Sequence, residues 1–308
     1  MVQKNNLNKK LIIICGPTAS GKTELALECA KILNTEIISA DSMNVYCGLD
    51  VGTAKPNRTE REQVKHHLID VVSPLNSFSV GDYKEKAEPI IEKLFSENKT
   101  PIICGGTGFY VNSLIYNLSY GKSPANLIAR EKYFNLVEEK GAEYVYNILL
   151  SVDPESAKKI HFNDVKRVVR ALEIYESGVK KSELNDLNVP IRDYLAYYID
   201  FDRSTLYDRI DKRVDIMIEN GLIEEVSGLV NSGIDISYQC MQGIGYKEVY
   251  SYLKNEISLE ECINLIKLNT RHYAKRQLTF FKKLPNLIAL KPNYSKILAE
   301  RIVGDLCK

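Results

Sequence analysis

A short apolar run that begins at Leu11 leads directly into a glycine-rich loop ending in Lys22 and Thr23. From Gly16 onward the residues match the pattern G-x-x-x-x-G-K-[ST], which joins a buried strand to a helix through a loop that wraps a phosphate. The glycines let backbone amides surround the anion, the lysine neutralises it, and the threonine hydroxyl is a ligand for Mg²⁺. The sequence therefore predicts a strand, a phosphate-binding loop and a helix that begins near Gly21.

We assign phosphate binding to the whole loop and Mg²⁺ binding to Thr23. The loop residues are Gly16, Pro17, Thr18, Ala19, Ser20, Gly21, Lys22 and Thr23. An ordinary turn between a strand and a helix is the alternative, and the pattern does not distinguish a diphosphate from a triphosphate.

Composition limits the class of protein. With 308 residues, of which 44% are hydrophobic, the chain is long enough to bury a large core. A net charge of +1 means that any nucleic-acid surface must come from local clusters of basic residues. The seven cysteines are scattered without C-x-x-C spacing, which argues against a disulfide framework and a zinc site. The cysteine pattern favours a reducing cytoplasm, and the polar N-terminus and missing long apolar runs predict no membrane segment. We also expect a monomer.

Strand and helix patterns alternate in the first third of the chain. Predicted buried strands at 35–39 and 101–104 indicate a parallel sheet with helical crossovers. The pattern then changes to short helices, and a strand returns at 194–201. We therefore predict an α/β fold with a P-loop NTPase-like parallel sheet flanked by helices and an all-helical insertion domain. The limits are 1–117 for the first part of the core, 118–192 for the insertion and 193–308 for the second part of the core. Further helices are predicted over 82–98, 110–118, 204–220, 222–232 and 258–283.

Asp41 directly follows the second predicted strand. In open α/β sheets, ligands bind at the carboxyl ends of the strands, so we expect Asp41 to face the same crevice as Lys22. A helix cap and an outer-shell partner of Mg²⁺ are the alternatives for this carboxylate.

A second glycine-rich turn, at 105–108, follows the strand at 101–104. Its glycines permit close approach of other backbone segments, and Thr107 offers a hydroxyl at another strand end. An ordinary strand-to-helix turn is again the alternative.

Basic residues gather in the long helix predicted near the end of the chain. Residues 271–283 contain five lysines and arginines, no acidic residue and interleaved aromatic side chains, a composition that suits a nucleic-acid backbone and stacked bases. The alternative is a solvated helix face that anchors Leu278 and Phe281 in the core. In an earlier helix, Arg209 and Arg213 are four residues apart and share one face.

Together these motifs resemble the tRNA dimethylallyltransferase family, also called tRNA isopentenyltransferases. The matching blocks run in the family's order at 16–23, 41–46, 48–56, 105–110, 161–164, 167–173, 243–248 and 270–279. A generic phosphate-loop protein shares only the first block. Three positions depart from the family pattern: Asn44 stands where glutamine is frequent, Cys47 where a basic residue is frequent, and Phe162 where proline is frequent.

The resemblance implies transfer of a dimethylallyl group from dimethylallyl diphosphate to N6 of an adenosine beside the tRNA anticodon. The expected target is position 37 of tRNAs that read codons beginning with U, and diphosphate is released. By this resemblance Asp41 is the base that accepts the N6 proton, Thr107 bonds near the reacting groups, and Arg213 helps to clamp the diphosphate. The adenosine would be flipped into a channel between the sheet and the insertion.

The same resemblance implies that tRNA contacts both the core and the insertion. The residues are Asp41, Ser42, Met43, Asn44, Thr107, Arg130, Asn163, Lys166, Arg167, Gly243, Tyr246, Lys247, Arg271, Lys275 and Arg276.

Two other classes of protein use such a phosphate loop. A small-molecule or nucleotide kinase binds ATP there, but it has no need of the basic segment or the helical insertion. A pure tRNA-binding module or an ATPase switch is the other class. The sequence shows no apolar run that ends in aspartate, which argues against a motor-type ATPase.

Overall fold

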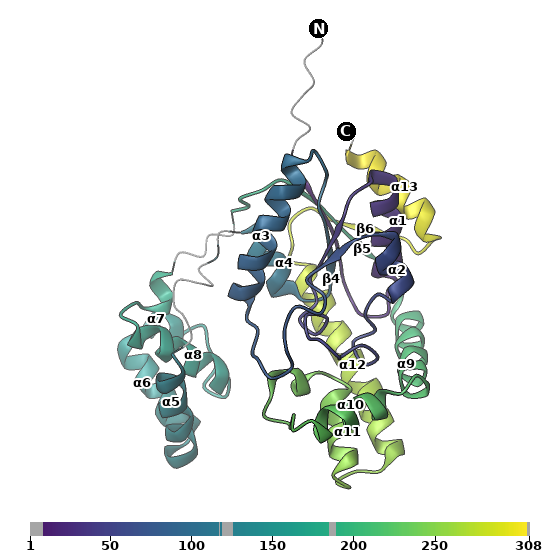
Figure 1. Ribbon diagram of the computed structural model, residues 1–308. Coiled ribbons are helices and arrows are strands. Elements are labelled where there is room, and N and C mark those ends of the chain that lie inside the picture. Colours follow the sequence, from purple (N-terminus) through teal and green to yellow (C-terminus); the bar gives the residue numbers. More distant parts are fainter. Residues whose placement is uncertain (1–8, 117, 119–125, 185–188, 307–308) are drawn as a thin grey trace. The chain divides into compact units, whose positions relative to one another are not determined.

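The computed structural model describes residues 9–116, 118, 126–184 and 189–306. The first eight residues, the predicted boundary residue 117 and Cys307 lie outside this part of the chain. Within it, six parallel strands form one sheet in the order β3-β2-β4-β1-β5-β6 (Figure 1). The strands are β1 (Leu11–Cys15), β2 (Ile37–Ser39), β3 (His66–His67), β4 (Ile102–Gly105), β5 (Tyr194–Ile199) and β6 (Leu287–Leu290).

Strand β1 lies inside the sheet, between β4 and β5. All of its residues are buried, which explains why it reads as an unbroken apolar run. Helices α1 (Lys22–Leu33) and α13 (Ser295–Leu306) pack together against one face of the sheet. Figure 1 shows α3 (Val80–Ser96) and α4 (Gly108–Ile115) on the other face. The predicted α/β fold with a flanked parallel sheet is confirmed.

The helices in the second part of the core follow the predicted limits closely. They are α9 (Arg203–Glu219), α10 (Leu222–Asn231) and α12 (Leu259–Phe281). Asp202 and Ser258 fix the starts of α9 and α12, because each side chain accepts a hydrogen bond from a backbone amide of the first turn.

Some short elements escaped prediction. They are α2 (Arg58–Gln63), the 3₁₀ turn η2 (Gln239–Gln242) and α11 (Tyr246–Leu253). Each is too short for a helical period of apolar residues to stand out. The helix predicted over 110–118 was placed two to three residues too late, since α4 runs from Gly108 to Ile115.

Residues 116–189 form a compact unit of their own, and residues 1–115 and 190–308 form the other. The helices of the smaller unit are α5 (Leu127–Lys140), α6 (Ala142–Val152), α7 (Pro154–Ala157) and α8 (Val165–Glu176), followed by the 3₁₀ turn η1 (Lys181–Glu183). Val145, Leu149 and Leu172 are completely buried in its core. This unit therefore has a hydrophobic core separate from the one that covers the sheet.

Two further observations concern the protein's environment. Across the described ranges, none of the helices is both long and apolar enough to cross a membrane. The cysteines in the same ranges are free thiols.

Candidate active site

A cavity of about 430 Å³ lies where the carboxyl ends of β1, β2 and β4 meet. Lys22 lines it from the phosphate loop, Asp41 from the segment after β2, and Gly106 from the turn after β4. Helices α9 and α12 complete the lining with, among others, Arg213 and Gln277. Parallel strands present their carboxyl ends at one edge of the sheet, and this is why residues distant in sequence meet here.

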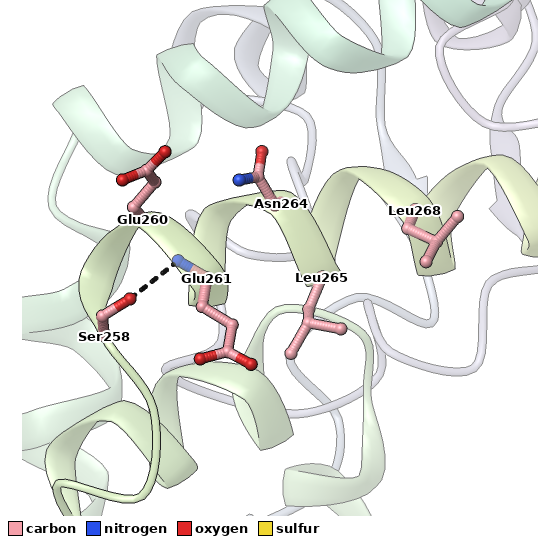
Figure 2. A pocket seen from close by; sticks show the side chains of 6 residues that line it. All are labelled: Ser258, Glu260, Glu261, Asn264, Leu265 and Leu268. Atoms are coloured by element: carbon pink, nitrogen blue, oxygen red, sulfur yellow. Dashed lines mark hydrogen bonds between the residues drawn. The ribbon is translucent and has the colours of Figure 1, made fainter.

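A second depression lies at the start of α12 (Figure 2). It is lined by Ser258, Glu260, Glu261, Asn264, Leu265 and Leu268. Two carboxylates and no cationic side chain face it, and the Ser258 hydroxyl already accepts the Glu261 amide at 3.2 Å. Because carboxylates repel a phosphate group, the cavity at the strand ends is the candidate active site.

The phosphate loop has the backbone of an anion site. Ala19 and Gly21 have positive φ angles of 61° and 84°, a conformation that turns successive amides toward one point. Gly21 is the N-cap of α1 and supplies no side-chain cap, so the first amides of that helix are left to an anion. The Ser20 hydroxyl donates to the Pro17 carbonyl at 2.9 Å and tightens the loop.

Lys22 supplies the positive charge of the loop. Its Nζ donates to the Pro17 carbonyl oxygen. Burial lowers the pKa of Lys22 to about 8, because an ammonium group loses hydration inside the protein. An anion in the cavity restores the favourable environment that the buried ammonium lacks.

Arg213 is the second cation of the cavity. Its Nη2 donates to the Thr53 carbonyl at 3.3 Å, while its Nε is buried without a hydrogen-bond partner among the described residues. Burial lowers the pKa of Arg213, and nearby Asp41 opposes this shift. A buried guanidinium N–H without a partner is a site for an anionic acceptor. One turn earlier, Arg209 Nε donates to the Ala19 carbonyl at 2.8 Å and holds the loop against α9.

Thr107 joins two neighbouring strand ends, and Asp41 closes a turn beside it. Asp41 Oδ1 accepts the amide of Met43 at 2.9 Å, and Thr107 Oγ1 accepts the amide of Ser42 at 2.9 Å. The residues after Asp41 form turns rather than a helix, so the helix-cap alternative for this carboxylate is wrong. Asp41 instead closes a local turn and lines the cavity.

Most residues predicted to contact tRNA from the core line the same cavity. These are Asp41, Ser42, Met43, Asn44, Gly243, Tyr246, Lys247 and Arg276. Tyr246 is only 1% exposed, and its hydroxyl donates to Glu225 at 2.6 Å. Glu225 also accepts the amides of Val51 and Gly52, so this pair anchors the 48–56 loop beneath the cavity.

The three basic residues of α12 predicted to contact tRNA, Arg271, Lys275 and Arg276, lie in two different environments. Arg271 Nη1 lies 3.2 Å from Asp211 Oδ2 and links α12 to α9, and it does not line the cavity. Lys275 and Arg276 are exposed and line a groove with His272, Thr279, Phe280 and Lys283. Phe281 of the same helix is buried. A basic surface and an anchored core face therefore coexist on α12.

The smaller unit presents its predicted tRNA residues in two ways. Asn163, Lys166 and Arg167 are exposed at the start of α8. Arg130 instead forms an ion pair with Glu173, with Nη2 and Oε2 2.9 Å apart, and Glu173 has no exposed surface. Arg130 therefore neutralises a buried carboxylate, which is costly to leave unpaired.

The three departures from the family pattern also differ in position. Cys47 and Phe162 are exposed, and the Phe162 ring stacks on His161 with centroids 4.6 Å apart. Asn44 lines the cavity, and its Oδ1 is buried without a partner among the described residues. This oxygen is available to a hydrogen-bond donor of a ligand.

Sequence reasoning missed several cavity residues, among them Tyr273 and Gln277 of α12. These two belong to a face of α12 that repeats at 266, 270, 273 and 277, the spacing of one helix stripe, and this repeat is the signal that finds them. Burial raises the pKa of Tyr273 above its ordinary value, whereas a hydrogen bond with Thr107 opposes the shift.

Comparisons with known proteins agree with this arrangement. The family model described as IPP transferase matches residues 44–284. The tRNA dimethylallyltransferase of Acetivibrio thermocellus is 50% identical over 281 residues, which cover 90% of each chain. The crystal structure of the full-length tRNA isopentenylpyrophosphate transferase from Bacillus halodurans is 39% identical and superposes with a TM-score of 0.73 over 97% of each chain.

A eukaryotic dimethylallyltransferase, crystallised acting on tRNA, is 29% identical with a TM-score of 0.83, covering 97% of this chain and 80% of that one. The similarity thus extends through the phosphate loop, the strand ends and the basic helix that meet at one cavity. Agreement of this extent means that the chain belongs to the tRNA dimethylallyltransferase family.

Proposed function

We propose that the protein transfers a dimethylallyl group from dimethylallyl diphosphate to N6 of an adenosine next to the tRNA anticodon and releases diphosphate. The proposed target is position 37 of tRNAs that read codons beginning with U. The observation that carries the proposal is the cavity in which Lys22, Asp41 and Arg213 meet. Membership of the tRNA dimethylallyltransferase family supports the choice of donor and acceptor.

The diphosphate is assigned to the phosphate loop. The amides at the start of α1, Lys22 and the unpaired Nε of Arg213 supply hydrogen bonds and positive charge where charge grows on the departing group. Cleavage of the allylic C–O bond leaves its electron pair on the diphosphate, so these groups lower the main barrier.

The cavity also fits Mg²⁺. Thr23 and Asp41 bring oxygen donors to the same cavity, and Mg²⁺ prefers one or two protein oxygens together with phosphate and water. Thr23 would hold the ion directly, with the diphosphate and water as its other ligands. When bound, Mg²⁺ neutralises negative charge on the diphosphate.

Asp41 is proposed as the general base. The N6 nitrogen of adenine is a poor nucleophile because its lone pair is delocalised into the ring. As N6 bonds to the allylic carbon, one N6 proton passes to the Asp41 carboxylate, and a base of this kind supplies about 10² to 10⁴ in rate. Thr107 keeps Asp41 in place by accepting the amide of the next residue, Ser42.

Two exposed surfaces are proposed to bind the tRNA. One is the groove of α12 that contains Lys275 and Arg276, and the other is the start of α8 with Lys166 and Arg167. Both present cations to a phosphate backbone. We further propose that the enzyme acts in the cytoplasm as a monomer, and the free thiols among the described residues suit a reducing compartment.

The test is transfer of label from isotopically labelled dimethylallyl diphosphate to tRNA, run beside an ATP hydrolysis assay. We expect label in tRNA, at the adenosine next to the anticodon, and no ATP turnover that depends on tRNA. Phosphoryl transfer from ATP without prenyl transfer would make the protein a kinase and overturn the proposal.

A further inference from the structure

Gln277 joins two loops of the active site. It lies in α12 and is 4% exposed. Its Oε1 accepts the amide of Thr18 at 2.9 Å, and its Nε2 donates to the carbonyl of Gly106 at 3.0 Å. One side chain thus connects the phosphate loop after β1 with the glycine-rich turn after β4.

The neighbouring residues leave room for this connection. A Cβ atom at Gly106 would lie 2.1 Å from Gln277 Nε2, so only glycine lets the amide reach the carbonyl. A buried amide group without partners costs free energy, yet here the oxygen and the nitrogen are both bonded to backbone groups. Gln277 is therefore fixed by the two loops and fixes them in return.

We propose that Gln277 is a positioning residue that sets the distance between the diphosphate site and the general base. Its oxygen holds the loop that binds the leaving group. Its nitrogen holds the turn that carries Thr107, and Thr107 holds the segment of Asp41 through Ser42. The inference rests on the proposed function for the identity of the reactants. A misplacement of about 1 Å between reacting groups costs about 10² in rate. A loose connection here should therefore slow the reaction, although both polar atoms of Gln277 are bonded to backbone groups.

Two substitutions separate the halves of the connection. Gln277→Met has a similar length but neither a donor nor an acceptor of comparable strength. Gln277→Glu keeps an acceptor for the Thr18 amide and loses the donor to Gly106. The control is Asn264→Met, which also replaces a side-chain amide of α12 with methionine, but at an exposed position in the depression at the start of the helix (Figure 2).

We expect the single-turnover rate of Gln277→Met to fall by about 10², with the KM for dimethylallyl diphosphate changed by less than about ten-fold. Hydrogen exchange of the Thr18 amide should accelerate in Gln277→Met and stay slow in Gln277→Glu. The single-turnover rate of Gln277→Glu should also fall. The Asn264→Met control should match the wild type in every measurement. Urea unfolding of each variant reports whether it is folded.

An independent perturbation comes from the other side. Gly106→Ala should displace the Gln277 amide and lower the rate as Gln277→Met does. When Gly106→Ala is combined with Gln277→Ala, the new methyl group no longer collides with the Gln277 amide. The double variant should therefore be no slower than Gly106→Ala alone, so the effects of the two substitutions on the rate should not be additive. If the rate losses of the two single variants instead multiply in the double variant, the proposed connection is overturned.

A wild-type rate in Gln277→Met, or faster Thr18 exchange with an unchanged rate in both Gln277 variants, would refute the positioning role. The outcome is separable from the proposed function. If the wild type transfers no dimethylallyl group, that function fails. Thr18 exchange and the binding of inorganic pyrophosphate then still decide whether Gln277 fixes the phosphate loop.

Discussion

Two glycine-rich turns follow neighbouring strands of one sheet, yet they need glycine for different reasons. In the phosphate loop, Gly21 has a φ of 84°, and a Cβ placed there would have no heavy atom closer than 3.8 Å. At the end of β4, where the second turn begins, Gly105 has no positive φ, but a Cβ would lie 2.2 Å from the carbonyl oxygen of Ala40. The first glycine allows a backbone conformation, and the second allows two backbones to touch.

The difference extends to what the turns do. The phosphate loop leads to helix amides without a side-chain cap and to the buried ammonium of Lys22, groups that suit an anion. The polar groups of the second turn bind other parts of the protein. The Thr107 amide donates to the carbonyl of Ala40, and the Thr107 hydroxyl accepts the amide of Ser42. Similar glycine-rich sequences therefore form an anion-binding loop after β1 and, after β4, a turn that holds neighbouring segments together, which we call the clamp.

The largest expected effect is on stability at the clamp. Gly105→Ala places a methyl group against the Ala40 carbonyl, where neither backbone can move without breaking the pairing of β2 with β4. We expect a loss of about 3 kcal/mol in the free energy of unfolding, measured by urea titration. Gly228→Ala, in the open interior of α10, is the control and should gain about 0.5–1 kcal/mol. Equal stability of the two variants would contradict the steric reading of the second turn.

The next effect tests what the clamp holds. Asp41→Asn keeps the size of the side chain but removes the proton acceptor, so single-turnover transfer should fall by about 10² or more while pyrophosphate binding changes little. The measurement is a Mg²⁺ titration of the single-turnover rate. Full recovery at high Mg²⁺ would make Asp41 an outer-shell partner of the ion instead of the base.

A smaller effect tests the charge of the binding loop. The pKa of Lys22 is lowered to about 8, so the ammonium is present below that pH and is lost as the pH rises through it. Pyrophosphate affinity, measured by calorimetry, should fall by about ten-fold for each pH unit above 8. Lys22→Arg stays protonated throughout this range and should remove the fall. An identical pH profile in Lys22→Arg would assign the titration to the ligand.

The smallest effect concerns the backbone of the binding loop. Gly21→Ala makes only ordinary contacts, the nearest at 3.8 Å, so its cost is that of the left-handed conformation, about 1 kcal/mol by urea unfolding. A loss larger than that of Gly105→Ala would reverse the comparison between the two turns.

Much of this organisation was predictable because its signals are local. The apolar run of β1, the phosphate loop and the start of α1 are contiguous, so the pattern from Leu11 to Thr23 contains all of them. The caps Asp202 and Ser258 likewise mark the starts of α9 and α12 within a few residues. Helix α11 was missed because it is short and begins at a glycine with an unusual backbone, Gly245 with φ of 98°.

The candidate site was predictable only in part, because composition does not tell which face a side chain occupies. Arg271 and Arg276 belong to one basic run, yet Arg271 pairs with Asp211 of α9 while Arg276 reaches the cavity and the exposed groove. Likewise Tyr246 lies in a block expected to contact tRNA, and its hydroxyl is bonded to Glu225 inside the core. The partners that decide these roles lie on other helices.

The sequence by itself determined the α/β fold, the phosphate loop and the family resemblance, since each depends on patterns within short stretches of chain. Only the tertiary structure decided which polar groups bond to one another. Gln277 and Thr18 are 259 positions apart, and nothing near either residue indicates the other. Buried amides and cations take whatever partner the packing of distant elements brings within about 3 Å. The sequence names the groups available for chemistry, and the packing of α9 and α12 against the strand ends assigns their roles.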